Sequence, residues 1–173
     1  MNTTKKRLIA YYSRKGENYV SGQIVDLEKG NTAIVAEKIQ ALTGYDLFEI
    51  DTVESYPVDY HETTRVAKRE LRAQARPALT ATVNGMEEYD VIYLGYPNWW
   101  STFPMAVSTF LESYDFSGKT ILPFCTHEGS GMGGERDIHK LCPTAQVGKG
   151  LAIVGSRVKE ADASIKAWIG NQK

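Results

Sequence analysis

The stretch Y-D-V-I-Y-L-G-Y-P-N-W-W-S-T-F-P, residues 89–104, limits the fold more than any other part of the chain. Val91 to Leu94 form a short, unbroken apolar run, which is typical of a strand buried on both faces in a parallel sheet. Pro97 cannot continue a central strand, because it has no backbone N–H to donate to a neighbour. Trp99 and Trp100 are therefore predicted to lie on a loop at the carboxyl end of a buried strand.

Two adjacent indole rings at that position have two interpretations. The carboxyl edge of an open α/β sheet is where ligands bind, and a pair of rings there would suit a flat aromatic ligand. The alternative is that Trp99 and Trp100 only cover the edge of the sheet. Loops on a rigid scaffold often carry function, which favours the ligand-binding interpretation.

The rest of the chain alternates between strand-like and helix-like segments. Further strands are expected at residues 7–12, 45–50, 120–124 and 146–154, the last interrupted by glycines. Helices are expected at residues 32–43, within 56–77, and at 104–114, 137–141 and 161–169. This alternation predicts a single α/β domain, residues 1–173, in which helices cover both faces of a five-stranded parallel sheet.

Residues 17–29 do not fit this alternation. The segment from Tyr19 to Lys29 mixes apolar and charged residues at no helical period, which favours a small hairpin or an irregular excursion. We therefore expect residues 17–29 to form an insertion in the loop between the first strand and the first helix.

The composition argues against several classes of partner and location. A formal net charge of -1 provides no long-range field to attract nucleic acid or an anionic membrane. The basic N-terminal residues precede an apolar run that is too short for a signal peptide, and no stretch approaches the length of a membrane span. A cytoplasmic protein is therefore expected. Cys125 and Cys142 lack the spacing of a redox pair or a zinc knuckle, so we expect packed thiols and no metal site.

One segment could be read differently. The charged helix expected over residues 62–76 carries several arginines and lysines, as a nucleic-acid contact would. Glu62 and Glu70 interrupt the basic run, and Val66, Ala67 and Leu71 provide a weak apolar face. The pattern favours a helix with a solvated charged face.

Three loops follow strands that should end at the same edge of the sheet. The first provides the hydroxyls of Ser13 and Thr32, and Gly30 and Asn31 can turn backbone N–H groups towards a phosphate at a helix N-terminus. The second carries the two tryptophans. The third, residues 126–134, contains four glycines that permit close backbone approach, and His127 adds a titratable side chain. Together the three loops indicate a site for a phosphorylated planar heterocycle.

These motifs resemble those of the flavodoxin superfamily, in particular bacterial flavodoxin-like proteins with an extended first loop. The segments Y-Y-S-R-K-G-E-N and G-N-T-A-I-V-A-E-K-I resemble the family's phosphate motif, and G-Y-P-N-W-W-S-T-F-P resembles its flavin loop. The resemblance covers nearly the whole chain. It implies a flavodoxin-like three-layer sandwich with strand order 2-1-3-4-5, and FMN as the cofactor.

The resemblance also implies which residues bind FMN. Ser13, Asn31 and Thr32 would hold the phosphate, with Arg14 as an additional contact. The residues flanking the isoalloxazine would be Pro97, Asn98, Trp99 and Trp100. Those closing the other side would be Thr126, His127, Gly129, Ser130 and Gly131. Because residues 17–29 split the phosphate motif, Gly16 to Asn18 could supply the phosphate donors in place of Gly30 to Thr32. The insertion is expected to rim the phosphate or flavin end of the crevice.

The flavin loop is also similar to that of NAD(P)H:quinone reductases. That similarity implies an FMN-dependent oxidoreductase acting on a quinone-like or other small acceptor, with His127 as a catalytic proton donor. The alternative is a flavodoxin-type electron carrier between redox proteins. Such carriers are typically acidic and steer towards basic partners, whereas this chain is nearly neutral, which favours the enzyme.

Two further classes share part of the pattern. Signalling receiver domains have the same strand order, but they need an acidic cluster after the first strand, where Tyr11, Tyr12 and Ser13 stand here. A serine hydrolase would need a glycine two residues before Ser130, and Glu128 occupies that place. Neither class is favoured.

Overall fold

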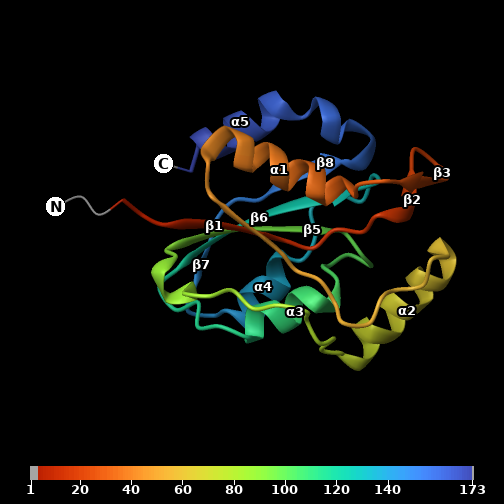
Figure 1. Cartoon of the computed structure of the whole chain (residues 1–173), viewed down its shortest axis with the longest axis horizontal. Helices are drawn as coiled ribbons and strands as arrows, with labels where there is room; N and C mark the ends of the chain where they lie inside the picture. Colours follow the sequence, from red (N-terminus) through yellow and green to blue (C-terminus); the bar gives the residue numbers. More distant parts are fainter. Residues whose placement is uncertain (1–3, 173) are drawn as a thin grey trace.

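The computed structural model describes residues 4–172, and its main sheet is parallel (Figure 1). The sheet contains β1 (Arg7–Tyr11), β4 (Asp46–Glu49), β5 (Val91–Pro97), β6 (Thr120–His127), β7 (Gln146–Val147) and β8 (Leu151–Val154). The strand order is β4-β1-β5-β6-β7, and β8 also pairs with β6. This is the expected order 2-1-3-4-5, with the fifth strand divided into β7 and β8.

Helices cover both faces of the sheet, as predicted. Helices α1 (Asn31–Thr43) and α5 (Asp162–Gly170) lie on one face, and α2 (Tyr60–Ala73), α3 (Met105–Glu112) and α4 (Glu135–Leu141) lie on the other (Figure 1). Two 3-10 turns, η1 (Met86–Glu88) and η2 (Gly155–Glu160), precede β5 and α5. None of the helices within residues 4–172 has the length and apolarity needed to cross a membrane.

Alternate residues of the central strands bury opposite faces. In β1, Leu8 packs in the core beneath α3 and α4, whereas Ile9 packs in the core beneath α1 and α5. In β5, Ile92 and Tyr93 divide in the same way, and all four side chains are at most 2% exposed. A strand with two buried faces needs the continuous apolar run seen in its sequence.

Strand β6 is longer than the predicted strand 120–124, because Pro123 does not end it. One side of β6 pairs with β5 from Thr120 to Thr126. The other side pairs with β7 through Thr120 and Ile121, and with β8 from Phe124 onward. Pro123 falls in the gap between β7 and β8, where no neighbouring strand requires its missing N–H.

The expected insertion forms an antiparallel hairpin, β2 (Gly16–Val20) and β3 (Gln23–Leu27), which is a separate two-stranded sheet. Its turn residues, Ser21 and Gly22, both have positive φ, as the tight turn of a hairpin requires. The hairpin lies at the carboxyl end of the parallel sheet, on the same side of the molecule as the start of α2 (Figure 1).

Both cysteines are free and buried, as the sequence predicts. Burial raises the pKa of the Cys125 thiol from 9.0 to about 12, and that of the Cys142 thiol from 9.0 to about 11. At neutral pH these thiols are protonated, so they behave as small apolar core groups.

The free energy of unfolding is expected to fall as the pH rises above about 9. In the unfolded chain Cys125 loses its proton near 9.0, whereas the folded chain keeps it until about 12, so the unfolded state holds fewer protons in between. The Cys125 thiol therefore does not lower the free energy of unfolding below pH 9. Above pH 9 it lowers that free energy by about 1.4 kcal/mol per pH unit. Urea unfolding between pH 8 and 11 measures how steeply the free energy of unfolding falls with pH. In Cys125→Ala that slope should be smaller by the contribution of about one proton. Identical slopes in the two proteins would contradict this assignment.

Candidate functional site

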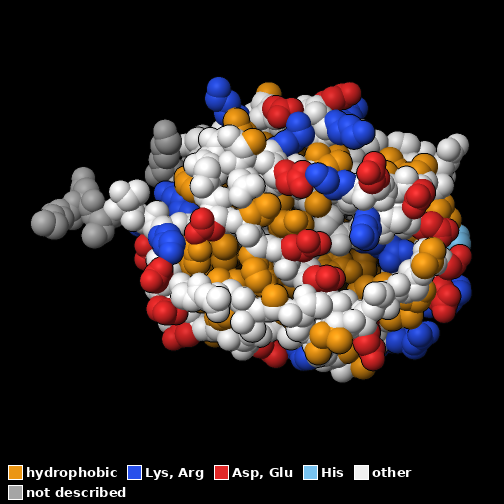
Figure 2. Space-filling model, viewed as in Figure 1, with side chains coloured by type: hydrophobic (Ala, Val, Ile, Leu, Met, Phe, Trp, Pro, Cys, Tyr) orange, Lys and Arg blue, Asp and Glu red, His pale blue; other side chains and the backbone are white. Residues whose placement is uncertain are grey.

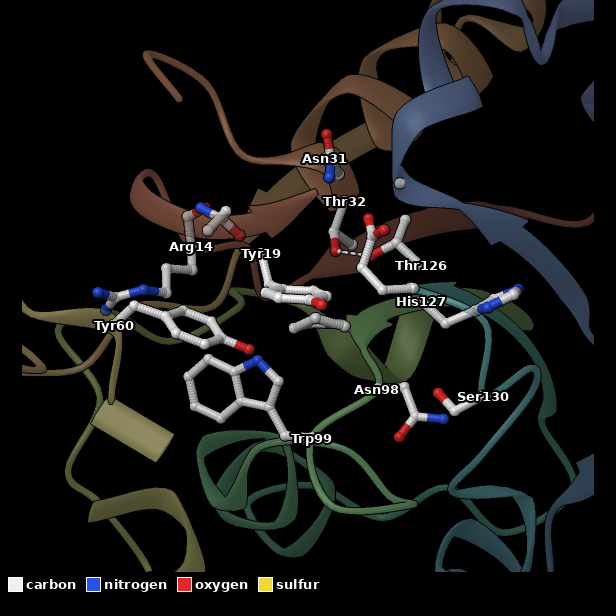
Figure 3. A pocket seen from close by; sticks show the side chains of 14 residues that line it. Arg14, Tyr19, Asn31, Thr32, Tyr60, Asn98, Trp99, Thr126, His127 and Ser130 are labelled. Atoms are coloured by element: carbon white, nitrogen blue, oxygen red, sulfur yellow. Dashed lines mark hydrogen bonds between the residues drawn. The ribbon is translucent and has the colours of Figure 1, made fainter. Parts of the chain in front are cut away.

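A cavity of about 190 Å³ opens at the carboxyl edge of the sheet (Figure 3). Its walls come from the β1–β2 connection, the start of α1, the β5–α3 loop, the β6–α4 loop and the hairpin. The lining residues are Arg14, Asn18, Tyr19, Asn31, Thr32, Tyr60, Pro97, Asn98, Trp99, Thr126, His127, Glu128, Ser130 and Gly155. We call this space the cofactor cavity.

The N-terminus of α1 forms one end of the cofactor cavity. Its N-cap is Gly30, and no acidic residue lies in its first turn, so its dipole is not neutralised within the helix. The Oγ of Ser13 accepts a hydrogen bond from the backbone N–H of Ala33 at 3.0 Å. Ser13 therefore fixes the helix start and is not among the residues lining the cofactor cavity. The residues of α1 that line this end of the cavity are Asn31 and Thr32.

Thr32 and Thr126 join the first and third loops beneath the cavity. Their Oγ1 atoms are hydrogen-bonded at 2.8 Å, and the residues are 1% and 4% exposed. The bond connects the first turn of α1 with the end of β6, two segments 94 residues apart in sequence. It sets the distance between the helix N-terminus and the glycine-rich loop.

Replacing either threonine alone by valine is expected to cost more stability than replacing both. Thr32→Val or Thr126→Val leaves the partner hydroxyl buried without its hydrogen bond. This should lower the free energy of unfolding by about 1–3 kcal/mol. The double variant removes both polar groups and should recover most of that loss. Urea unfolding of the four proteins measures the coupling. Strictly additive losses would show that the bond contributes nothing.

The β5–α3 loop places the two indoles differently. Trp99 is half-buried and packs edge-on against Tyr12 and Tyr56, with ring centroids 5.5 and 5.2 Å away. Trp100 is 47% exposed, and its φ of 57° is left-handed, as is the φ of 69° at Ser101. Non-glycine residues in this region store strain of about 1–3 kcal/mol each, and such strain clusters at functional sites.

Asn98 ties the tryptophan loop to the glycine-rich loop. Its Nδ2 donates to the carbonyl of Gly131 at 3.0 Å, and its Oδ1 accepts from the backbone N–H of Ser101 at 3.0 Å. The buried Tyr96 adds a second link, because its hydroxyl donates to the carbonyl of Gly133 at 2.7 Å. The two loops that were expected to flank a flat ligand are therefore held at a fixed separation.

His127 lies at the end of β6 and turns its ring away from the aromatic side chains of the cavity (Figure 3). Its Nδ1 accepts a hydrogen bond from the backbone N–H of Gly129 at 2.9 Å. The neutral ring then carries its proton on Nε2. This contact orients the start of the glycine-rich loop, and the predicted role of His127 as a proton donor stays a prediction.

Most of the residues expected at the site line the cofactor cavity. Those that do are Arg14, Asn31, Thr32, Pro97, Asn98, Trp99, Thr126, His127 and Ser130. Four expected residues are not among its lining: Ser13, Trp100, Gly129 and Gly131. Ser13 caps α1, Trp100 lines the adjacent space described below, and the two glycines have positive φ and shape the loop.

Sequence reasoning missed four lining residues, Tyr19, Tyr60, Glu128 and Gly155, and named Asn18 only as part of the alternative phosphate segment Gly16 to Asn18. The hairpin provides Asn18 and Tyr19, and the expectation that the insertion rims the crevice was the signal for Tyr19. Tyr19 stacks on Tyr60 with ring centroids 6.1 Å apart. Tyr60 begins α2, and the charged sequence of this helix does not indicate a binding role. The ring on which Tyr60 stacks belongs to Tyr19, 41 residues earlier in the chain.

Glu128 fastens the hairpin across the mouth of the cavity. Its Oε2 accepts from the backbone N–H of Ser21 at 3.1 Å. A methyl group at Gly155 would collide with both the Glu128 carboxylate and the Asn31 amide, so these two groups lie close together at the α1 end of the cavity. Burial, followed by the proximity of Tyr19 and Glu128, raises the pKa of Tyr60 above its usual value.

A second chamber, of about 290 Å³, continues from the cofactor cavity towards α2. It shares five lining residues with that cavity, which are Arg14, Asn18, Tyr60, Asn98 and Trp99. Its remaining lining residues are Thr63, Thr64, Ala67 and Trp100. The two spaces therefore adjoin along these shared residues, and together they make a crevice that runs from the N-terminus of α1 past Trp99 to Trp100 and α2.

Comparisons with known proteins agree with this fold. A solved structure from Bacteroides eggerthii, named as a flavoprotein, gives a TM-score of 0.78 at 28% identity, over 97% of this chain and 98% of that one. Another so named, from Bacteroides uniformis, gives 0.76 at 29% identity, over 97% and 99%. A flavoprotein from Lactobacillus acidophilus in complex with FMN shares the fold, with a TM-score of 0.66 at 20% identity over 96% and 99%. Among curated proteins, none matches the chain.

The flavodoxin family profile matches residues 6–172. This range runs from the residue before β1 to the end of α5, so it includes the loops on all sides of the crevice. The protein therefore belongs to the flavodoxin family, whose cofactor is FMN.

Proposed function

We propose that this protein is an FMN-dependent oxidoreductase that passes electrons from a reduced nicotinamide to a quinone-like or other small acceptor. The observation that carries the proposal is the second chamber, which offers aromatic walls beside the cofactor cavity. A protein that only exchanges electrons with partner proteins needs no such compartment. An enzyme needs room for a second substrate next to its cofactor.

The residues of the cofactor cavity fit FMN. Backbone N–H groups at the start of α1, with the side chains of Asn31 and Thr32, would hold the phosphate. The Asn98 amide and the Trp99 ring, on the opposite wall, would hold the flavin ring. The bound flavin supplies reversible two-electron chemistry, and the protein contributes binding, orientation and control of access.

The net reaction balances with one proton from solvent. NAD(P)H, a quinone and a proton give NAD(P)+ and a hydroquinone. The protein's part is to bind both substrates at the crevice and to exclude bulk water from it. The hairpin contributes to that exclusion, because Tyr19 and Asn18 close one side of the cavity.

Electron carriage is the second candidate, because the stacked rings of Tyr19 and Tyr60 partly cover the crevice. A carrier would also need a charged surface for its partners. On the face shown in Figure 2, acidic and basic side chains are interspersed over the centre and the right, where β2 and β3 lie, and acidic side chains gather only along the lower left edge. That arrangement supports the enzyme over the carrier.

Visible absorption of the purified protein tests the proposal. We expect a flavin spectrum after addition of FMN, and bleaching of that spectrum by NADH or NADPH under anaerobic conditions. Addition of a quinone should restore the oxidised spectrum. A bound flavin that no nicotinamide bleaches would favour the carrier, and failure to bind FMN in excess would overturn both candidates.

Glu128→Gln is expected to tighten FMN binding about three- to tenfold. The Glu128 carboxylate lies near Asn31, at the end of the cavity that fits a phosphate, and like charges at that distance repel. Glutamine keeps an oxygen that can accept from Ser21 N–H, so the hairpin contact survives. Titration of flavin fluorescence at low and high salt measures the gain, which should shrink with salt. Glu87→Gln, an exposed carboxylate at the opposite end of the sheet, is the control, and equal effects of the two changes would contradict the repulsion.

A further inference from the structure

The second chamber is lined by ring faces and small side chains. The rings of Tyr60, Trp99 and Trp100 provide its aromatic surface, and Ala67 on α2 leaves room between them. Its volume of about 290 Å³ lies at the lower end of ligand pockets, which run from about 300 to 1,000 Å³. A ligand with one or two fused rings matches that size.

The two threonine hydroxyls in the chamber wall are already engaged. Thr63 Oγ1 donates towards the carbonyls of Pro57 and Asp59, at 2.8 and 3.0 Å, and Thr64 Oγ1 donates to the carbonyl of His61 at 2.6 Å. The two threonines therefore have no hydroxyl proton free for a ligand, so recognition rests chiefly on ring contacts and charge, with the Tyr60 hydroxyl as a further polar group.

The charge at the chamber is positive. No aspartate or glutamate is among its lining residues, whereas Arg14 is. Within residues 4–172, Arg14 donates only to backbone carbonyls, those of Glu17, Pro57 and Val58, at 2.9 to 3.1 Å, and no carboxylate of this part of the chain pairs with its guanidinium. Figure 3 shows that Arg14 extends along the Tyr60 side, away from Asn31 and Thr32. Its position therefore suits the second chamber better than the phosphate end of the cofactor cavity.

Trp100 lines the chamber, and Lys68 lies beside its ring although it is not among the lining residues. Trp100 Nε1 donates to the carbonyl of Thr64 at 3.0 Å, which holds the indole against α2 in spite of its left-handed backbone. Lys68 Nζ lies 4.8 Å from the centroid of the Trp100 ring. An ammonium group therefore lies next to a partly exposed indole ring that lines the chamber.

We propose that the second chamber is the acceptor site of this oxidoreductase, and that it selects planar aromatic molecules bearing a carboxylate or sulfonate. The inference rests on the proposed function and adds the substrate class. Ring faces hold the planar body, while Arg14 and Lys68 attract the anionic group. An aromatic acceptor without a charge enters the same space but lacks that attraction.

Binding of two redox-inert probes tests the inference without turnover. Naphthalene-2-sulfonate and the neutral 2-naphthalenemethanol share one ring system, and titration calorimetry on the FMN-loaded protein measures both. We expect the sulfonate to bind about five- to tenfold more tightly, which corresponds to about 1–1.4 kcal/mol. Indole N–H resonances of Trp99 and Trp100, assigned with Trp100→Phe, should shift on binding.

Three variants locate the site. Lys68→Gln should weaken sulfonate binding about three- to fivefold and leave the neutral probe unchanged, as for an exposed charge contact. Ala67→Leu, which fills the chamber from a helix that tolerates leucine, should weaken both probes at least about tenfold. Lys166→Gln on α5 makes the same charge change on another face and should alter neither.

The outcomes separate this inference from the proposed function. If FMN binds and is reduced by a nicotinamide, but the sulfonate does not bind or ignores both Lys68→Gln and Ala67→Leu, the assignment of the second chamber is wrong while the proposed function stands. If FMN does not bind, both are wrong. Sulfonate binding that Ala67→Leu abolishes, with unchanged FMN affinity, supports the assignment.

Discussion

Removing the hairpin is expected to lower FMN affinity about 100-fold, or about 2.8 kcal/mol. Gly16 and Leu27 are cross-strand partners, so an Asn-Gly turn can join them in place of residues 17–26. The deletion takes away Asn18 and Tyr19 from the cavity wall, together with the Ser21 contact to Glu128. The crevice then opens to water on one side, and each polar contact to the cofactor weakens.

The fold should survive this deletion, because the hairpin is a sheet of its own and contributes no strand to the parallel sheet. Circular dichroism and the thermal midpoint separate lost binding from lost structure. Gln23→Ala, an exposed change on the same hairpin that does not touch the cavity lining, is the matched control and should bind FMN as the parent does. An affinity within about threefold of the parent after the deletion would show that the hairpin is not part of the site.

The layer order of this fold could be predicted because burial on both faces leaves a direct trace in the sequence. Runs such as Val91 to Leu94 have no polar alternation, and the sheet has the expected order. The length of β6 could not be predicted in the same way. Whether Pro123 ends a strand depends on what lies beside it, and the gap between β7 and β8 is formed by residues about 25 positions later.

The residues of the site divide in the same way. The nearby sequence predicts the place of some of them, and contacts with distant parts of the chain decide the place of the others. Some site residues follow a strand end or begin a helix, so their place at the carboxyl edge could be predicted from the sequence. These are Asn31, Thr32 and the residues from Pro97 to Trp99. The place of Tyr60 could not be predicted, because it depends on how the start of α2 packs beside the hairpin, where the Tyr60 ring stacks on Tyr19. Ser13 was expected at the phosphate, but a hydroxyl at a helix start can serve either the ligand or the backbone. Here it accepts from the N–H of Ala33.

Gly30→Ala is expected to lower FMN affinity about 100-fold and to destabilise the protein by about 1–3 kcal/mol. Gly30 has an ordinary φ of -65°, so alanine is not strained by its backbone angle there. A Cβ at this position would instead collide with the Ser13 Oγ and with the backbone carbonyl of Arg14. Backbone cannot rotate aside as a side chain can, so the β1–β2 connection must move away from α1. That movement separates the helix N-terminus from the wall opposite it, and a misplacement of about 1 Å is enough to weaken a binding site severely.

Gly170→Ala separates this steric effect from the general effect of replacing glycine. A Cβ at Gly170 meets nothing within 4 Å, at the end of α5. Replacing an unstrained glycine by alanine usually stabilises a protein by about 0.4–1 kcal/mol, because the unfolded chain loses freedom. The two variants should therefore change the free energy of unfolding in opposite directions, and only Gly30→Ala should change the FMN titration. If Gly30→Ala were as stable as Gly170→Ala and bound FMN normally, the close contact of Gly30 with Ser13 and Arg14 would not be what shapes the phosphate end of the cavity.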